Sequence, residues 1–169
     1  MQSILETPRL ILRRFIMEDA PLLLELNSDP DVTRYLHEPP LTSLAEAERV
    51  LQEIILPQYT LYNLGRWAIH TKENNKFVGW CGLKYRLEAQ EVDLGYRLHK
   101  RNWGKGFATE AASHTLSYGL DTLLLPMILG RAHIDNKASQ HVLEKIGMQF
   151  VREEMEDDCQ IRVYRTGKQ

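Results

Sequence analysis

The stretch Arg101-Asn102-Trp103-Gly104-Lys105-Gly106 lies between a strand-like segment, residues 92–98, and a helix-like segment, residues 107–120. Its two glycines can adopt positive φ and present bare backbone N–H groups. The helix that follows adds unpaired first-turn donors and the positive end of its dipole. The arginine and the lysine of the stretch bring positive charge to the rim. The order of strand, glycine loop and helix therefore predicts a loop that binds a phosphate.

The two common nucleotide-binding motifs fit this loop badly. A dinucleotide-binding fingerprint needs a third glycine or small residue, but bulky Phe107 and then Thr109 stand in that region. A P-loop needs Ser or Thr directly after the lysine, and Lys105 is followed by Gly106. The sequence therefore favours a different phosphate ligand.

The loop instead resembles the pyrophosphate loop of the GNAT superfamily of N-acetyltransferases, whose pattern is Gln/Arg-x-x-Gly-x-Gly/Ala. Arg101, Gly104 and Gly106 fill that pattern without a gap. Further segments, in the same order, resemble the Rim-type branch, which contains the N-terminal acetyltransferases of ribosomal proteins. They are residues 7–13 (TPRLILR), 29–32 (DPDV), 93–96 (DLGY), 103–111 (WGKGFATEA) and 136–148 (NKASQHVLEKIGM). The resemblance covers nearly the whole chain.

The resemblance implies acetyl-CoA as the cosubstrate and no metal. In this superfamily the strand before the loop bulges and splays from its neighbour, and the thioester arm of acetyl-CoA lies in the gap. Backbone groups of that strand would hold the pantetheine. The residues expected to bind the cofactor are Tyr96, Arg97, Leu98, Arg101, Asn102, Trp103, Gly104, Lys105, Gly106, Phe107, Ala108, Thr109, Asn136 and Ser139.

Asp93 is the candidate general base. It lies in the alternating segment 91–98, where Gly95 suggests either a bulge or a close backbone approach. The Rim-type pattern usually has Glu at the position of Asp93, and the implied role is to deprotonate the amine, through a water molecule. The alternative is a solvated or ion-paired strand carboxylate. His133, at the end of a predicted strand, is a second candidate base or an ordinary strand-end histidine.

Ser139 is the candidate acid. It shares one helical face with Val142, Leu143 and Ile146, so its hydroxyl faces inward and needs a partner. Many GNAT proteins place a Tyr one turn further along to protonate the departing thiolate, but this chain has Leu143 there. The resemblance then assigns the role to Ser139 or leaves it unfilled, and the alternative is a first-turn Ser bonded to a carbonyl. Asn136 is expected to cap the helix, and the matching Asn of the family also contacts the cofactor.

Several other residues have both a functional and a structural interpretation. Tyr35, Trp67 and Trp80 are candidates for the walls of an acceptor pocket, or they belong to the core. The acidic run at residues 156–158 could attract a cationic substrate, or it is only a turn. Cys81 is expected to be a small buried hydrophobic residue.

Composition narrows the class of protein. The 169 residues suit one domain, residues 1–169, with 43% hydrophobic and 26% charged residues. The net charge of −2 argues against a nucleic-acid partner held by a basic face. No apolar run approaches the ~20 residues that span a bilayer, so no membrane partner is expected. Two cysteines suit a reducing cytoplasm, and six scattered histidines give no metal-ligand spacing.

The order of elements predicts an α+β fold, in which a mixed, mostly antiparallel sheet is splayed at a bulged strand and flanked by helices. Strands are expected near residues 9–16, 66–71, 76–87, 91–98 and 127–133, with two more around the turn at 156–158. Helices are expected at 18–27, 43–56, 107–120 and 137–146.

The function predicted from the resemblance is an acetyl-CoA-dependent N-acetyltransferase in which a primary amine attacks the thioester directly. The alternative is a catalytically silent CoA-binding sensor or partner module. The acceptor is either a protein N-terminus or a small amine, and fold-level analogy does not choose between them. A monomer and a homodimer are equally compatible with the sequence.

Overall fold

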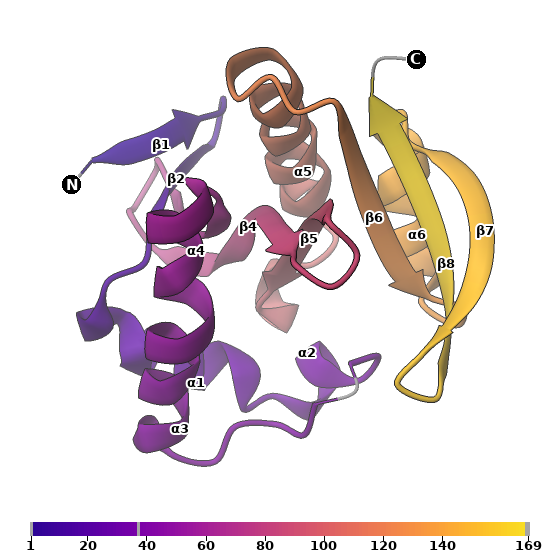
Figure 1. Ribbon diagram of the computed structural model, residues 1–169. Coiled ribbons are helices and arrows are strands. Elements are labelled where there is room, and N and C mark those ends of the chain that lie inside the picture. Colours follow the sequence, from indigo (N-terminus) through magenta and orange to yellow (C-terminus); the bar gives the residue numbers. More distant parts are fainter. Residues whose placement is uncertain (1, 37, 168–169) are drawn as a thin grey trace.

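One eight-stranded sheet runs through the molecule, with the strand order β1-β2-β3-β4-β5-β6-β8-β7 (Figure 1). The computed structural model describes residues 2–36 and 38–167. Neighbouring strands are antiparallel except β5 and β6, which are parallel. The strands are β1 (Ser3–Glu6), β2 (Leu10–Arg14), β3 (Gly65–Thr71), β4 (Phe77–Arg86), β5 (Glu91–Leu98), β6 (Met127–His133), β7 (Gln149–Glu156) and β8 (Cys159–Gly167). The predicted mixed, mostly antiparallel α+β sheet is confirmed.

The helices lie on both faces of this sheet (Figure 1). They are α1 (Ala20–Asn27), α2 (Pro30–Thr33), α3 (Leu44–Val50), α4 (Leu56–Tyr62), α5 (Phe107–Ser117) and α6 (Lys137–Lys145). Short 3₁₀ turns, Met17–Asp19 and Lys100–Asn102, precede α1 and the glycine loop, and π-helical turns, Leu51–Ile55 and Tyr118–Thr122, follow α3 and α5. The predicted N-cap of α6 is confirmed, and α3 has a side-chain N-cap as well. The side chain of Ser43 accepts from the N–H of Glu46, and that of Asn136 accepts from the N–H of Ser139.

Three features differ from the sequence-based expectation. The edge strand β1 and the single-turn helix α2 were not predicted, because both are too short to show a period. The helix expected at 43–56 continues to Tyr62 instead of stopping before Pro57. A π-helical turn precedes Pro57, and the proline then occupies the first turn of α4. At that position a residue does not need its N–H for a helical hydrogen bond, so proline is tolerated.

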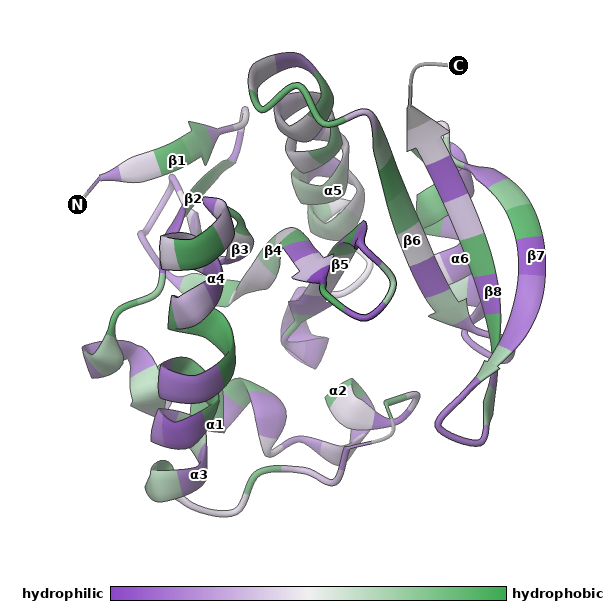
Figure 2. Ribbon diagram, viewed as in Figure 1, coloured by the Kyte–Doolittle hydropathy of each residue, from purple (hydrophilic) through white to green (hydrophobic). Residues whose placement is uncertain are grey.

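The core lies between the sheet and its helices. Leu12, Leu23 and Trp67 are almost completely buried, and the ring of Trp67 meets Tyr118 edge-on at 5.6 Å. The first half of β6 is hydrophobic, as its place inside the sheet requires (Figure 2). Cys81 is fully buried, and burial raises the pKa of its thiol to about 12, so it is the small buried residue that we expected and carries no thiolate near neutral pH.

The feature that positions the site is the separation of β5 from β6. These strands pair at Asp93 with Leu129 and at Leu94 with Gly130, and within residues 2–36 and 38–167 the backbone from Gly95 to the end of β5 has no strand partner on that side. The splay is therefore confirmed. The β4–β5 ladder keeps one register throughout, so Gly95 does not mark a bulge against β4. A Cβ at Gly95 would lie 3.5 Å from the ring of Trp80, which is an ordinary van der Waals contact.

Candidate active site

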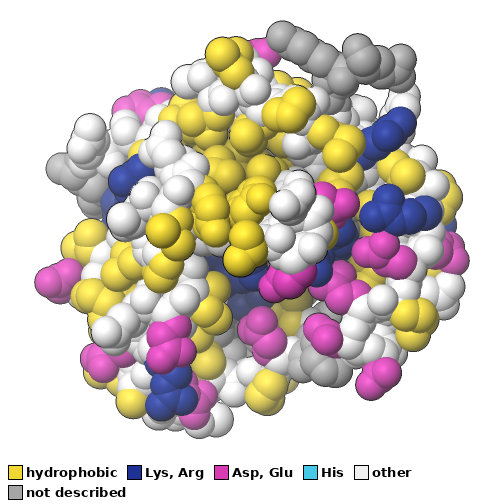
Figure 3. All heavy atoms as spheres, viewed as in Figure 1, with side chains coloured by type: hydrophobic (Ala, Val, Ile, Leu, Met, Phe, Trp, Pro, Cys, Tyr) yellow, Lys and Arg dark blue, Asp and Glu magenta, His cyan; other side chains and the backbone are white. Residues whose placement is uncertain are grey.

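A cleft of about 810 Å³ opens on the face of the sheet that Figure 3 shows. Its lining comes from the segment after α2, from α4, from strands β3 to β6, from the start of α6 and from the β7–β8 turn. Basic side chains lie at the bottom of the hollow, and acidic side chains lie nearer its edge (Figure 3). Strand β5 runs from this cleft, at Asp93, to the glycine loop that follows Leu98.

The glycine loop has the predicted conformation. Gly104 and Gly106 have φ of +75° and +79°, in the left-handed region that favours glycine. Gly106 occupies the N-cap position of α5 without a side-chain cap. Within the described part of the chain, the amides of Gly104, Lys105 and Gly106 donate to no other group. Free N–H groups at the N-terminus of a helix are a geometry that suits an anion, as the sequence predicts for this loop.

Arg9 holds this loop in place, a role that sequence analysis did not assign. Its guanidinium donates to the carbonyl of Lys105 at 2.9 Å and to Glu110 at 2.8 Å, and lies 4.6 Å from the centre of the Phe107 ring. The hydroxyl of Thr7 also donates to Glu110, at 2.6 Å. Burial opposes ionisation of Glu110, but the hydrogen bonds from Thr7 and Arg9 lower its pKa. The sequence of segment 7–13 does not predict these contacts, since a contact across about a hundred residues leaves no local signal.

The basic residues around the loop are partly engaged. Arg101 is exposed and pairs with Glu25 of α1 at 3.2 Å, and Lys100 pairs with Asp31 at 2.7 Å. Trp103 braces the loop against β5, because its indole N–H donates to the carbonyl of Leu98 at 3.0 Å. The predicted rim charge of Arg101 is therefore present, although a ligand would compete with an exposed ion pair for it.

Ser139 meets Tyr96 at the splay. The phenol of Tyr96 donates to Oγ of Ser139 at 3.2 Å, and both side chains line the cleft. Burial raises the pKa of Tyr96, so the phenol keeps its proton near neutral pH. Leu143 occupies the position where many family members have Tyr, and it packs over Gly130 of β6. The resemblance implies a role for the backbone of Tyr96 and none for its phenol, although the alternation of β5 puts its ring on the same face as Leu94 and Leu98.

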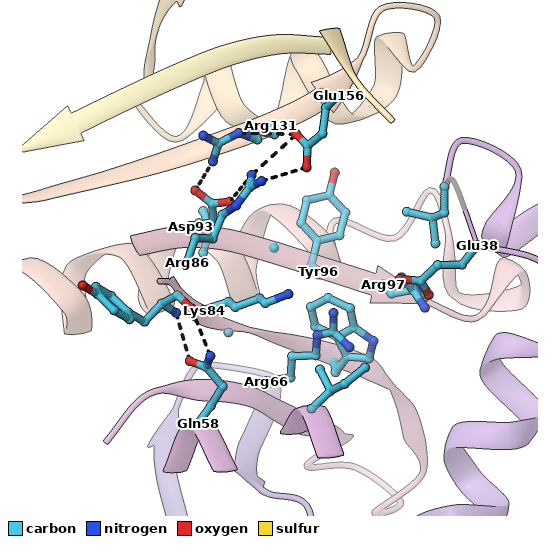
Figure 4. A pocket seen from close by; sticks show the side chains of 18 of the residues that line it. Glu38, Gln58, Arg66, Lys84, Arg86, Asp93, Tyr96, Arg97, Arg131 and Glu156 are labelled. Carbon is cyan, nitrogen blue, oxygen red and sulfur yellow. Dashed lines mark hydrogen bonds and ion pairs between the residues drawn. The ribbon is translucent and has the colours of Figure 1, made fainter. Parts of the chain in front are cut away.

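Asp93 lies in the cleft, bound by two arginines (Figure 4). Arg131 donates to one carboxylate oxygen and Arg86 to the other, the latter at 3.3 Å. Glu156 joins the cluster through Arg86, at 3.0 Å. Burial raises the pKa of Asp93, while the guanidinium groups of Arg131 and Arg86 oppose that rise. The contacts of Asp93 therefore match the alternative interpretation, an ion-paired strand carboxylate. The role of Asp93 as general base stays a prediction.

His133 also lines the cleft, with its ring 5.4 Å from that of Tyr35. Its Nδ1 accepts from the backbone N–H of Asp135 at 3.0 Å. In the neutral ring this contact leaves the proton on Nε2, which is then a donor and not a base. The geometry therefore disfavours His133 as the base.

The aromatic candidates divide between the cleft and the core. Tyr35 and Trp80 line the cleft, whereas Trp67 is buried against Tyr118 on the opposite side of the sheet. The acidic turn contributes Glu156 and Asp157 to the lining, and Glu156 is already paired with an arginine. Three basic side chains that the sequence did not single out for the cleft also line it: Arg66, Lys84 and the side chain of Arg97.

No group of three or more His, Cys, Asp or Glu side chains in residues 2–36 and 38–167 could hold a metal ion. No helix in the same ranges is long and apolar enough to cross a membrane.

Comparison with known proteins agrees with this geometry. The family model for the acetyltransferase (GNAT) domain matches residues 9–149. An uncharacterized N-acetyltransferase of Bacillus licheniformis, p20, is 33% identical over 147 residues, which are 86% of this chain and 82% of that protein. The crystal structure of an acetyltransferase from Agrobacterium tumefaciens is 25% identical, with a TM-score of 0.83 over 99% of this chain and 95% of that one.

One further solved structure has the same fold at lower identity. RimL, described as a ribosomal L7/L12 α-N-protein acetyltransferase in complex with coenzyme A, is 18% identical, with a TM-score of 0.84 over 98% of both chains. The likeness to RimL shows the fold alone. Family membership is shown by the match to the family model and by the relative in Bacillus licheniformis. The chain belongs to the GNAT family of acetyltransferases.

Proposed function

We propose that this protein transfers an acetyl group from acetyl-CoA to a primary amine. The observation that supports the proposal most is the arrangement along β5. The strand leads from the free amides of the glycine loop, past a backbone edge without a partner, to a cleft that carries candidate acid and base groups. An extended ligand with a phosphate group at one end and a reactive group at the other would fit along this path.

The residues present suit acetyl-CoA, which would supply the activated thioester. The amides of residues 104–106 and the N-terminus of α5 would hold the pyrophosphate. The free edge of Tyr96, Arg97 and Leu98 offers backbone groups to the amides of the pantetheine. RimL, which has this fold, was solved with coenzyme A bound. Binding of this kind fixes the reacting group in place, which is a large part of catalysis by proximity.

The chemistry needs a base for the amine and an acid for the departing sulfur. Asp93 would take the proton from the ammonium group through a water molecule, because its two oxygens are already bonded to Arg131 and Arg86. The raised pKa of Asp93 makes it a better base than a free aspartate. Ser139 would protonate the thiolate, and Tyr96 would replace that proton through their hydrogen bond. Backbone N–H groups on the free edge of β5 would stabilise the developing oxyanion.

The alternative function is a silent CoA-binding module, and Leu143 is the observation that favours it, because no hydroxyl stands at that position. Release of free thiol from acetyl-CoA in the presence of pooled primary amines separates the two functions. Thiol release above the rate without amines supports transfer. Acetyl-CoA binding by calorimetry, without amine-dependent thiol release, would establish the silent module. We place the protein in the cytoplasm, where a reducing environment suits its two free cysteines, Cys81 and Cys159.

A further inference from the structure

Three basic side chains lie together on the floor of the cleft, and the register of the sheet explains why. Arg66 of β3 stands opposite Gly82 of β4, and Trp80 of β4 stands opposite Arg97 of β5. Paired residues share a face and alternate residues of a strand return to it, so Lys84 of β4 joins the same side. All of these side chains therefore face the cleft, away from α5.

Gly82 and Gly95 keep the floor between these side chains open. They stand opposite one another in the β4–β5 ladder, on the same face as the three basic groups. Neither projects a side chain into the cleft, and a Cβ at Gly82 would lie 2.0 Å from the carbonyl oxygen of Gly65. A shallow space lined by three positive groups is the result.

The three basic groups lack acidic partners, unlike the other two arginines of the cleft. Arg86 and Arg131 are paired with Asp93 and Glu156, as the dashed lines of Figure 4 show. In the described part of the chain, Arg66, Lys84 and Arg97 form no ion pair. Arg97 donates instead to the neutral amide of Asn27, at 2.6 Å. Lys84 extends across the cleft with its ammonium group unpaired (Figure 4).

Nearby acidic groups offset the positive charge of these three side chains only in part. Burial, together with the nearby charge of Arg66, lowers the pKa of Arg97 to about 10. The side chain of Lys84 is exposed to the cleft, but partial desolvation there lowers its pKa too, and the charges of Arg66 and Arg86 add to the effect. The negative charge of Glu38, in the segment between α2 and α3, acts against these shifts and favours the charged form of all three groups. Glu38 is exposed, however, and in the residues that the structure describes it forms no ion pair with them. Unpaired charges in a partly buried site are costly without a counter-ion.

Trp80 provides an independent observation. Its side chain is 6% exposed and lines the cleft, and its indole N–H has no hydrogen-bond partner among the described residues. A buried donor without a partner destabilises the fold unless a ligand or water accepts from it. The guanidinium groups of Arg66 and Arg97 lie 4.6 Å and 5.3 Å from the centre of its ring, so this donor belongs to the same cluster.

We propose that Arg66, Lys84, Arg97 and the indole N–H of Trp80 form an anion-binding subsite, and that the acceptor amine carries a carboxylate or a phosphate group. The inference rests on the proposed acetyl transfer. It deepens that function by naming the class of acceptor. The anion would lie on the floor of the cleft, leaving the amine to face Asp93 and the splay between β5 and β6. A polyamine, which brings only positive charge, would be repelled by the same floor.

The test compares acceptors of equal length that differ only at the far end. The four compounds are an aminoalkyl carboxylate, an aminoalkyl phosphate, the uncharged aminoalkyl amide and the diamine. We expect wild-type kcat/KM to be highest for one of the two anionic compounds, and their ratio identifies which anion the subsite prefers. Arg66→Gln and Lys84→Gln should each lower kcat/KM for the anionic compounds about 10- to 100-fold, the range of one hydrogen bond to a charged group. Neither variant should affect the amide.

Lys72→Gln is the matched control, because it removes one positive charge at the far edge of the sheet, where Lys72 pairs with Glu6. It should leave all four acceptors unchanged. Thermal unfolding of each variant shows whether the fold is intact, and Lys84→Gln guards against a folding defect in Arg66→Gln because its side chain is exposed.

A binding measurement separates this inference from the proposed function. Calorimetric titration of the protein, saturated with CoA, measures affinity for the aminoalkyl carboxylate and phosphate without turnover. Binding that Arg66→Gln weakens by about 10- to 100-fold, with no acetylation of any amine, would keep the subsite and refute acetyl transfer. If the amide or the diamine is acetylated as well as the acids, the subsite is wrong and acetyl transfer stands. If no anionic compound binds or reacts, the subsite is also wrong.

Discussion

The hydroxyl groups of Tyr96 and Ser139 meet where β5 leaves β6, and their contact has a direct chemical consequence. If Ser139 protonates the leaving thiolate, Ser139→Ala should lower kcat about 100-fold while affinity for acetyl-CoA stays near wild type. The leaving thiol has a reference pKa of ~8.5, so the loss should shrink as pH falls. Steady-state kinetics across pH, together with calorimetry of acetyl-CoA binding, measure both quantities. Ser117→Ala, an exposed serine on α5, is the control.

Tyr96→Phe distinguishes a proton relay from a lone serine. If Tyr96 replaces the proton of Ser139, its loss should reproduce the kcat defect of Ser139→Ala. Should Tyr96→Phe keep the wild-type kcat, Ser139 acts without it. An unchanged kcat in Ser139→Ala would return Ser139 to a structural role as a first-turn residue of α6.

The second prediction for a single residue concerns Asp93 as the general base. Its raised pKa means that the basic form is lost as pH falls through a value above the usual 3.8, so wild-type kcat/KM should fall on the acid side of that value. Asp93→Asn keeps the shape and removes the basicity. We expect a large fall in kcat/KM at neutral pH that high pH partly restores, because free amine no longer needs a base. A variant with the wild-type pH–rate profile would show that Asp93 only anchors Arg86 and Arg131.

Among the elements, the glycine loop and α5 depend on positive φ at Gly104. A Cβ there would meet no atom within 4 Å, so Gly104→Val should fold, losing about 1–2 kcal/mol from the left-handed backbone alone. Affinity for acetyl-CoA, measured by calorimetry, should nevertheless be abolished, since the side chain and the altered loop would block the phosphate. Gly147→Val is the matched control, with φ of +97° and the same open surroundings but far from the loop. If both variants bind acetyl-CoA equally well, the loop is not the phosphate site.

The connection between β2 and α1 carries a stability prediction. Arg13 donates to both oxygens of Asp19, at 2.8 Å and 3.0 Å, and both side chains are about nine-tenths buried. Asp19 also accepts from the backbone N–H of Ile16 at 2.8 Å. Asp19→Ala should therefore lower the free energy of unfolding by about 3–5 kcal/mol, because it leaves Arg13 as a buried unpaired charge. Urea denaturation measures it, and Glu6→Gln, which breaks the exposed pair with Lys72, should have no measurable effect.

Elements with a strong local signal were predictable. The alternation of β5, the glycines before α5 and the cap at Asn136 each depend on neighbours within a few residues, and each stands where it was expected. The short elements and the helix that passes Pro57 were missed, because tertiary packing overrides weak local preferences. The partners of Asp93 could not be predicted either, since Arg86, Arg131 and Glu156 come from three other strands.

For the whole molecule, the sequence alone determined the order of the elements, the glycine loop before α5 and the family, because these depend on local spacing and on residue types in a fixed order. Only the tertiary structure decided which charges are neutralised. Strand register sets Arg86 and Arg131 against carboxylates, and leaves Arg66, Lys84 and Arg97 facing open space. Charge compensation depends on distances of a few ångströms between strands far apart in the chain, and no local pattern encodes such distances.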